Sequence, residues 1–216
     1  MRIWPAAIPL LLIACGRGSD WSSPEVSYDM IHVEADRLAV KTGPVGHDQW
    51  KSDATYVLVE AKNTDKQDLM VTLSAELYDQ GKKVVGKTRR ESLRIPAGGS
   101  RLFALVDDKQ AARPAAVGAR VDVRGAEMVG YPAPVVVTDG NVYFDQDRAV
   151  VAGNVTNNAE GEARAIVIGA FFDEKGRPMQ RPSTLFRLAG KGKRGTQMVG
   201  PPGSRAAYLF IGEVQY

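Results

Sequence analysis

The chain has 216 residues, a formal net charge of +3 and a single cysteine. One cysteine excludes disulfides within the monomer and metal sites built from several thiolates, and the near-neutral charge balance gives no reason to expect nucleic acid as a partner. About 200 residues are enough for one large or two small hydrophobic cores.

Residues 1–14 are typical of a secretion signal. Arg2 gives a positive start, and residues 8–13 form an apolar run too short to span a bilayer. The run ends in Leu12-Ile13-Ala14-Cys15, which resembles the bacterial lipobox. That resemblance implies cleavage before Cys15 and lipid on its thiol, the only covalent group that we expect. An ordinary signal peptide with an incidental cysteine is the alternative.

Lipid on Cys15 predicts a stable membrane anchor, because two or more acyl chains hold a protein on a bilayer. Gly16 follows the cysteine where an aspartate would favour the inner membrane, so the same resemblance predicts an outer-membrane address in the cell envelope. Residues 15–28 are rich in Gly, Ser, Asp and Pro, which predicts a short flexible tether.

An internal repeat organises the rest of the chain. A strand-like run ends at Asn63 and a similar run at Asn157, and a second pair of runs ends at Asp79 and Asp173, each 94 residues apart. Apolar residues alternate with polar ones in these runs, which is typical of half-buried β-strands. The turn after Asp79 contains Gly81, for which we expect a positive φ.

Further alternating runs give about seven short strands per copy, which predicts an all-β chain of two tandem immunoglobulin-like β-sandwiches over residues 29–126 and 133–216. Residues 107–113 form the best helix candidate and end before Pro114. Residues 125–134 contain the Gly and Pro residues expected at a boundary between the two sandwiches.

The repeated motif resembles a known family. Leu77-Tyr78-Asp79 before a glycine turn is similar to the signature of FxLYD-type domains, although Ala75 stands where that family has Phe. The second copy carries Phe171-Phe172-Asp173 at the same place. The resemblance implies immunoglobulin-like sandwiches of the kind found in prokaryotic envelope proteins, and it carries no catalytic residues.

No catalytic pattern accompanies these strands. His32 lies in an alternating run, His47 lies in a loop, and neither has a partner at metal-ligand spacing. Nucleophile elbows and phosphate loops are missing from the sequence, which predicts a protein that is not an enzyme and has no resident cofactor. One weak calcium site is suggested by oxygen ligands in turn-like segments, with ordinary turn chemistry as the alternative. Its ligands would be Asp139, Asn141, Asp145 and Asp147.

Basic side chains gather in matching regions of the two copies. They include Arg89 and Arg90 in the first, and Lys191, Lys193 and Arg194 in the second. A positive stripe could face anionic lipid or an acidic protein, whereas Lys and Arg on edge strands also prevent sandwiches from pairing edge to edge. Trp50, in a loop, is a candidate binding anchor or a cap on the core.

These features favour a membrane-anchored, non-enzymatic module that binds another envelope protein or helps to assemble an envelope complex. A binding module for envelope glycan or anionic lipid, using Trp50 or the basic stripe, is the alternative.

Overall fold

The computed structural model describes residues 26–46 and 51–215. The lipobox-like run that ends at Cys15, together with His47 and Trp50, lies outside the described residues. Within them the chain forms fifteen β-strands and one short 3-10 helix, η1 (Tyr28–Met30). All strands pair in antiparallel sheets, so the prediction of an all-β, immunoglobulin-like sandwich fold is confirmed.

The first eight strands, which we call the first module, make two sheets. In one, β1 and β2 pair with one side of β3 while β7 pairs with the other; in the second, β5 and β6 share one side of β4 while β8 takes the other. The strands are β1 (Ile31–Val33), β2 (Ala39–Val45), β3 (Ser52–Asn63), β4 (Leu69–Tyr78), β5 (Val84–Lys87), β6 (Glu91–Ile95), β7 (Ser100–Val106) and β8 (Gly118–Met128).

The second module, β9 to β15, repeats this plan. The central strand β10 lies between β9 and β14, and β11 pairs with β12 and β13 on one side and β15 on the other. Its strands are β9 (Val135–Asp145), β10 (Arg148–Asn157), β11 (Ala163–Phe172), β12 (Pro178–Gln180), β13 (Ser183–Leu188), β14 (Lys193–Val199) and β15 (Ala206–Gln215). Strands β4 and β11 have the same length and the 94-residue offset of the repeat.

Each module buries the apolar face of its strands. In β4 the side chains of Leu69, Val71, Leu73 and Leu77 are fully buried, and the residues between them face away from this core. Burial of one such side chain stabilises the fold by roughly 1.5–3 kcal/mol. The predicted period-2 pattern of the repeat therefore identifies the core face of the strand.

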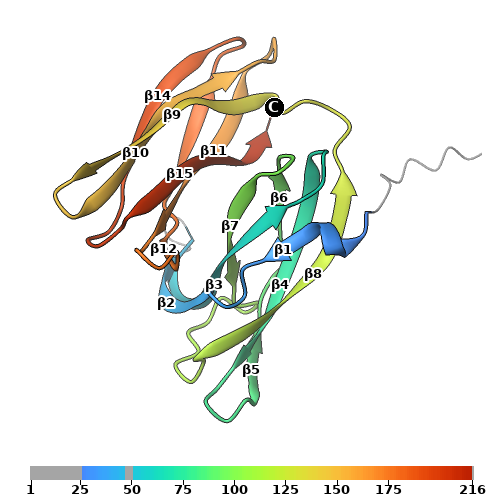
Figure 1. The fold of residues 1–216 in the computed structure, drawn as a ribbon, viewed down its shortest axis with the longest axis vertical. Coiled ribbons are helices and arrows are strands. Elements are labelled where there is room, and N and C mark those ends of the chain that lie inside the picture. The colour runs from blue at the N-terminus through green and yellow to red at the C-terminus, as the bar shows by residue number, and fades with distance from the viewer. Residues whose placement is uncertain (1–25, 47–50, 216) are drawn as a thin grey trace, which may run out of the picture.

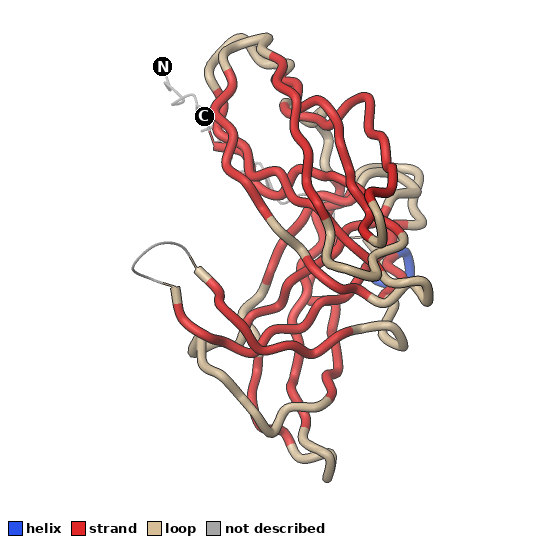
Figure 2. Tube along the Cα trace, turned by 90° about the vertical axis from the view of Figure 1, so that its left-hand side faces the viewer, coloured by secondary structure: helices blue, strands red, loops and turns tan. Residues whose placement is uncertain are grey.

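The two modules pack against each other rather than hanging on a loose connection. Ile168, Ala170, Phe172 and Phe210 of the second module belong to the same apolar cluster as the core of the first. Figure 1 shows β11 and β15 between β9, β10 and β14 on one side and the first module on the other. Figure 2 shows the same two bodies meeting from the side.

A buried asparagine closes the turn after the central strand in both modules. The Asn63 side-chain amide donates to the carbonyls of Gln67 (2.7 Å) and Ile95 (3.1 Å), and its Oδ1 accepts from the N–H of Asp65. Asn157 makes the equivalent bonds to Gly161, Ala189 and Ala159. The repeated asparagine thus ties the turn to the C-terminal end of β6 in the first module and of β13 in the second.

The predicted helix over residues 107–113 is wrong. The chain there forms a turn around the buried carboxylate of Asp107, which accepts hydrogen bonds from the N–H groups of Lys109 and Ala111 and from the Arg113 guanidinium. An acceptor that bonds its own downstream N–H groups competes with a helix for the same donors. The segment belongs to a longer connection, residues 107–117, whose counterpart in the second module spans only residues 200–205.

Two smaller expectations also change. The positive φ of the β4–β5 turn falls on Lys82 (62°) and not on Gly81, and the equivalent position of the second module is Gly176 (73°). Residues 26–28, expected in the tether, lie against β8, where the Val26 N–H donates to the Ala126 carbonyl. Strand β8 itself runs to Met128, past the expected end of the first sandwich.

Candidate functional site

The junction between the modules is built from aromatic and charged side chains. The Tyr208 hydroxyl donates to Glu60 Oε1 (2.9 Å), and the Tyr208 ring stacks on Phe172 with centroids 5.7 Å apart. Lys41 Nζ donates to the Met179 carbonyl (2.6 Å). These bonds join β2 and β3 of the first module to β12 and β15 of the second, so they fix how the two sandwiches sit together.

A second group of contacts closes the junction beside β7. Arg181 Nη2 donates to Glu91 Oε1 (2.6 Å), while Glu91 Oε2 accepts from the backbone N–H of Ala104 (2.7 Å). The guanidinium groups of Arg101 and Arg181 lie 5.1 and 5.8 Å from the centroid of the Phe210 ring. Because Glu91 occupies an N–H on β7, an edge strand of its sheet, it also keeps other strands from pairing there.

Burial perturbs the carboxyl groups of this junction. Loss of water raises the pKa of Glu60, and the Tyr208 hydrogen bond only partly offsets that rise. Burial likewise raises the pKa of Glu91 against the opposing effect of Arg181, and it raises the pKa of the Tyr208 hydroxyl well above its usual value. These groups are held by structural partners, Glu60 by Tyr208 and Glu91 by Arg181.

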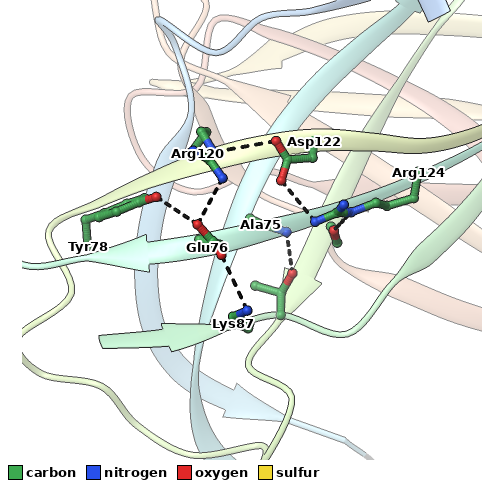
Figure 3. Close-up of polar contacts among 9 residues, drawn as sticks. Ala75, Glu76, Tyr78, Lys87, Arg120, Asp122 and Arg124 are labelled. Atoms are coloured by element: carbon green, nitrogen blue, oxygen red, sulfur yellow. Dashed lines mark hydrogen bonds and ion pairs between the residues drawn. The ribbon is translucent and has the colours of Figure 1, made fainter. Parts of the chain in front are cut away.

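The outer face of the β5-β4-β8 sheet carries a polar network (Figure 3). Glu76 accepts from the Tyr78 hydroxyl (2.8 Å) and Arg120 (3.0 Å), and Lys87 Nζ lies 3.5 Å from it. Asp122 pairs with Arg120 and Arg124. The Tyr78 hydrogen bond and the nearby cations hold the pKa of Glu76 below its usual value.

The matching face of the second module is apolar. In the first module, β4 and β8 pair Glu76 with Arg120 and Ser74 with Asp122. The equivalent pairs between β11 and β15 of the second module are Ala170 with Tyr208 and Ile168 with Phe210. This second face is the one that packs on the first module. The charged face of the first module is therefore unsuited to packing against another apolar sheet. Its charged groups would lose their water there without gaining new partners.

The exposed apolar end of β9 is the most unusual surface of the body. Val142, Tyr143 and Phe144 are 40%, 41% and 55% exposed. Successive strand residues point to opposite faces, so these three side chains place apolar surface on both sides of the strand. We call residues 140–145 the β9 end. Runs of exposed apolar residues on a strand are rare in soluble proteins unless they bind something.

The structure brings Arg89 and Arg90 together but separates them from the other predicted cations. Both line an open groove of about 300 Å³ beside the junction. Arg89 Nε donates to the Asp108 carbonyl (3.0 Å). The remaining lining residues are Val45, Gly46, Glu91, Ala104, Val106 and Gln110.

The predicted cations of the second module have local partners around the β13–β14 turn. Lys191 pairs with Glu160 (3.0 Å) and Lys193 with Asp139 (2.9 Å). The Arg194 guanidinium lies 5.1 Å from the Phe186 ring centroid. The two basic groups thus belong to different modules and do not form one stripe of unpaired charge.

We expected the calcium candidates to lie in turn-like segments, but most of them lie within a strand. Asp139, Asn141 and Asp145 all belong to β9, where Asp139 has a positive φ (55°) at a register shift in the pairing with β10. Asp139 Oδ2 accepts from Lys193 and Asn154, and Asp145 is six strand residues, or roughly 20 Å, away. Asp147 follows in the β9–β10 turn. Among residues 26–46 and 51–215, no cluster of three His, Cys, Asp or Glu side chains could hold a metal ion.

Two further expectations concern single residues and the membrane. His32 lies on the exposed side of β1, with Nε2 3.4 Å from Glu34 Oε1. In the part of the chain that the structure describes, no helix has the length and apolar character needed to cross a bilayer.

The sequence reasoning missed the β9 end, although a signal was present. Val142-Tyr143-Phe144 is a run of three consecutive apolar residues in a segment that forms a strand. A half-buried strand should alternate, so such a run predicts apolar side chains on a solvent face. The charged partners of the junction, Glu60, Glu91 and Arg101, carried no comparable signal.

Comparisons with known proteins give distant likenesses only. No family model and no curated protein match the chain. Among solved structures, it is similar to a DUF1425 family member from Shewanella sp. pv-4, with 14% identity, a TM-score of 0.34, and coverage of 37% of this chain and 77% of that one.

Two larger proteins show similar likeness. Red sea bream transglutaminase matches with 14% identity and a TM-score of 0.23, covering 77% of this chain and 27% of that one. A calcium binding mutant of Bacteroides uniformis beta-glucuronidase 2 matches with 12% identity and a TM-score of 0.24, covering 80% and 28%. These likenesses are too distant to carry an argument about function, and the immunoglobulin-like fold rests on the sheet topology above.

Proposed function

We propose that the protein is a lipoprotein of the cell envelope, held on the outer membrane through Cys15, whose two-module body binds another envelope protein without catalysing a reaction. The lipobox-like run before Cys15 and the similarity of Leu77-Tyr78-Asp79 to FxLYD-type domains support the address and the class of protein. The short tether would keep the body close to the membrane.

The observation that carries the proposal is the contrast between the surfaces of the body. The two modules share one apolar cluster, and Glu60 and Glu91 of the first module accept hydrogen bonds from the second. The body therefore presents its surfaces in a fixed arrangement. One end face is neutralised by the ion pairs of Figure 3, whereas the β9 end leaves Val142, Tyr143 and Phe144 exposed. A rigid body with a run of three exposed apolar residues on an edge strand is suited to protein binding.

Crosslinking in living cells of the native host tests this function. The lipidated chain is crosslinked, purified, and its partners are identified by mass spectrometry, with Cys15→Ala as the control that removes the anchor. We expect one dominant envelope protein that is lost in the control. Recovery of lipid or glycan without any protein would refute the proposal.

The groove at Arg89 and Arg90 supports a second candidate, a binding module for anionic lipid or envelope glycan. Two adjacent cations beside a groove attract phosphate or carboxylate groups. Under this hypothesis the chain binds vesicles that contain phosphatidylglycerol, and Arg89→Ala with Arg90→Ala abolishes that binding. Lys82→Ala with Lys83→Ala is the matched control, because it removes equal charge from the β4–β5 turn.

A further inference from the structure

We propose that the β9 end accepts an extended segment of a partner protein as an added β-strand, with apolar side chains of that segment packing on Val142, Tyr143 and Phe144. This inference rests on the proposed function, because it names the surface of the body and the form of the partner. It adds a binding mode and a class of ligand: an extended polypeptide whose side chains are mainly apolar.

The first argument comes from the backbone. Strand β9 lies at the end of the β14-β10-β9 sheet, so one side of it faces no other strand of that sheet. Within the described residues, the β9 end makes no backbone hydrogen bond besides its pairing with β10. An edge of this kind is a template for another strand, and proteins usually protect it with Lys, Pro or a covering loop. Val142, Tyr143 and Phe144 provide no such protection.

The second argument comes from the internal repeat. The register places Val40 and Thr42 of β2 at the positions that Val142 and Phe144 occupy in β9. Val40 is partly buried and packs on the core of the first module, whereas Val142 is 40% exposed. The Val40 position is therefore more covered than the Val142 position, whereas Thr42 and Phe144 are both exposed.

The unpaired edge of β9 determines the form of the occupant, because the free N–H and C=O groups of a strand edge are satisfied by another extended backbone. A segment of about six residues would match its length.

Site-specific photo-crosslinking in the native host tests the proposal on the full lipidated chain. A benzophenone amino acid replaces Phe144, and matched probes replace Leu185 and Val84, which are exposed apolar residues (58% and 43%) on other strands. We expect the Phe144 probe to capture one envelope protein at about ten times the yield of either control probe, because only it contacts the added strand.

A charge substitution gives the second readout. Phe144→Asp should lower recovery of the chemically crosslinked partner about tenfold or more, since a carboxylate cannot pack against the apolar segment. Leu185→Asp should leave recovery within about twofold. Circular dichroism and urea unfolding verify that both variants fold, as expected for exposed positions.

The possible outcomes separate the two proposals. A partner captured at Leu185 or Val84 but not at Phe144 overturns the β9 site and leaves the interaction function standing. A Phe144 product that contains two copies of this chain overturns the partner assignment in favour of self-pairing of β9. Failure of all three probes, together with an empty result from general crosslinking, refutes the interaction function itself.

Discussion

Tyr208 and Glu60 join the two modules through a single hydrogen bond, from the tyrosine hydroxyl to Glu60 Oε1 (2.9 Å). Tyr208→Phe removes the donor and leaves a partly buried carboxylate without this partner. We expect a loss of about 0.5–1.5 kcal/mol in the free energy of unfolding, measured with urea. Tyr143→Phe is the matched control, because the exposed Tyr143 hydroxyl has no structural bond to lose. Equal effects in the two variants would contradict the role of the bond.

The raised pKa of Glu60 predicts a pH dependence of a definite sign. A carboxyl whose pKa is higher in the folded state stabilises the fold below its unfolded pKa, and this contribution is lost as the pH rises through the folded value. Glu60→Gln still accepts the Tyr208 bond but has no charge to bury. We expect the variant to be more stable than the wild type at about pH 8, and the difference to disappear at about pH 3.5.

Glu76→Gln provides the control of opposite sign. The Tyr78 bond and the adjacent Arg120 lower the pKa of Glu76, so its contribution is present at neutral pH and lost on acidification. This variant should be less stable than the wild type at about pH 8 and equal to it in acid. The same sign of change in both variants would show that a general charge effect is being measured.

The buried asparagines should be important for stability in both modules. Asn63→Ala and Asn157→Ala each leave backbone carbonyls and an N–H without their partner, which should cost about 1–3 kcal/mol in the free energy of unfolding. Asn141→Ala, at an exposed position on β9, should cost less than about 0.5 kcal/mol. A small effect of Asn63→Ala would mean that water replaces its bonds at no cost.

Lys82 adopts a left-handed conformation that glycine adopts at the equivalent position of the second module, Gly176. A residue with a Cβ is strained in this conformation by roughly 1–2 kcal/mol. Glycine avoids the strain but loses more backbone conformational entropy on folding, which offsets part of the gain. We expect Lys82→Gly to raise the thermal midpoint and the stability by up to about 1 kcal/mol. Lys83→Gly lacks the strain and should lower both. Destabilisation by Lys82→Gly would contradict the strain.

Much of the fold could be predicted because the same strand pattern occurs in both halves of the sequence. The alternation of Leu69, Val71 and Leu73 identifies the core face of β4, and the spacing from Asn63 to Asn157 gives the second module from the first. These signals are local, since burial on one face of a strand requires a residue of the right kind at every second position.

The junction could not be predicted in the same way. Ile168 and Ala170 lie in a strand with ordinary alternation, and the local sequence does not indicate whether their face packs against the other module or is exposed to solvent. Glu91 and Arg181 are 90 residues apart and meet only through the folded arrangement. The helix at residues 107–113 failed because the buried carboxylate of Asp107 organises the turn, and burial is a tertiary property.

Hydrogen exchange of the β9 end measures whether a partner covers this strand edge. The purified full-length chain is compared with the crosslinked complex recovered from the native host, and exchange is read by mass spectrometry for residues 140–145 and for the equivalent strand β2. We expect the amides of the β9 end to exchange quickly in the isolated chain and to become protected in the complex, while those of β2 do not change. Protection that appears elsewhere, with the β9 end still exchanging quickly, would contradict it.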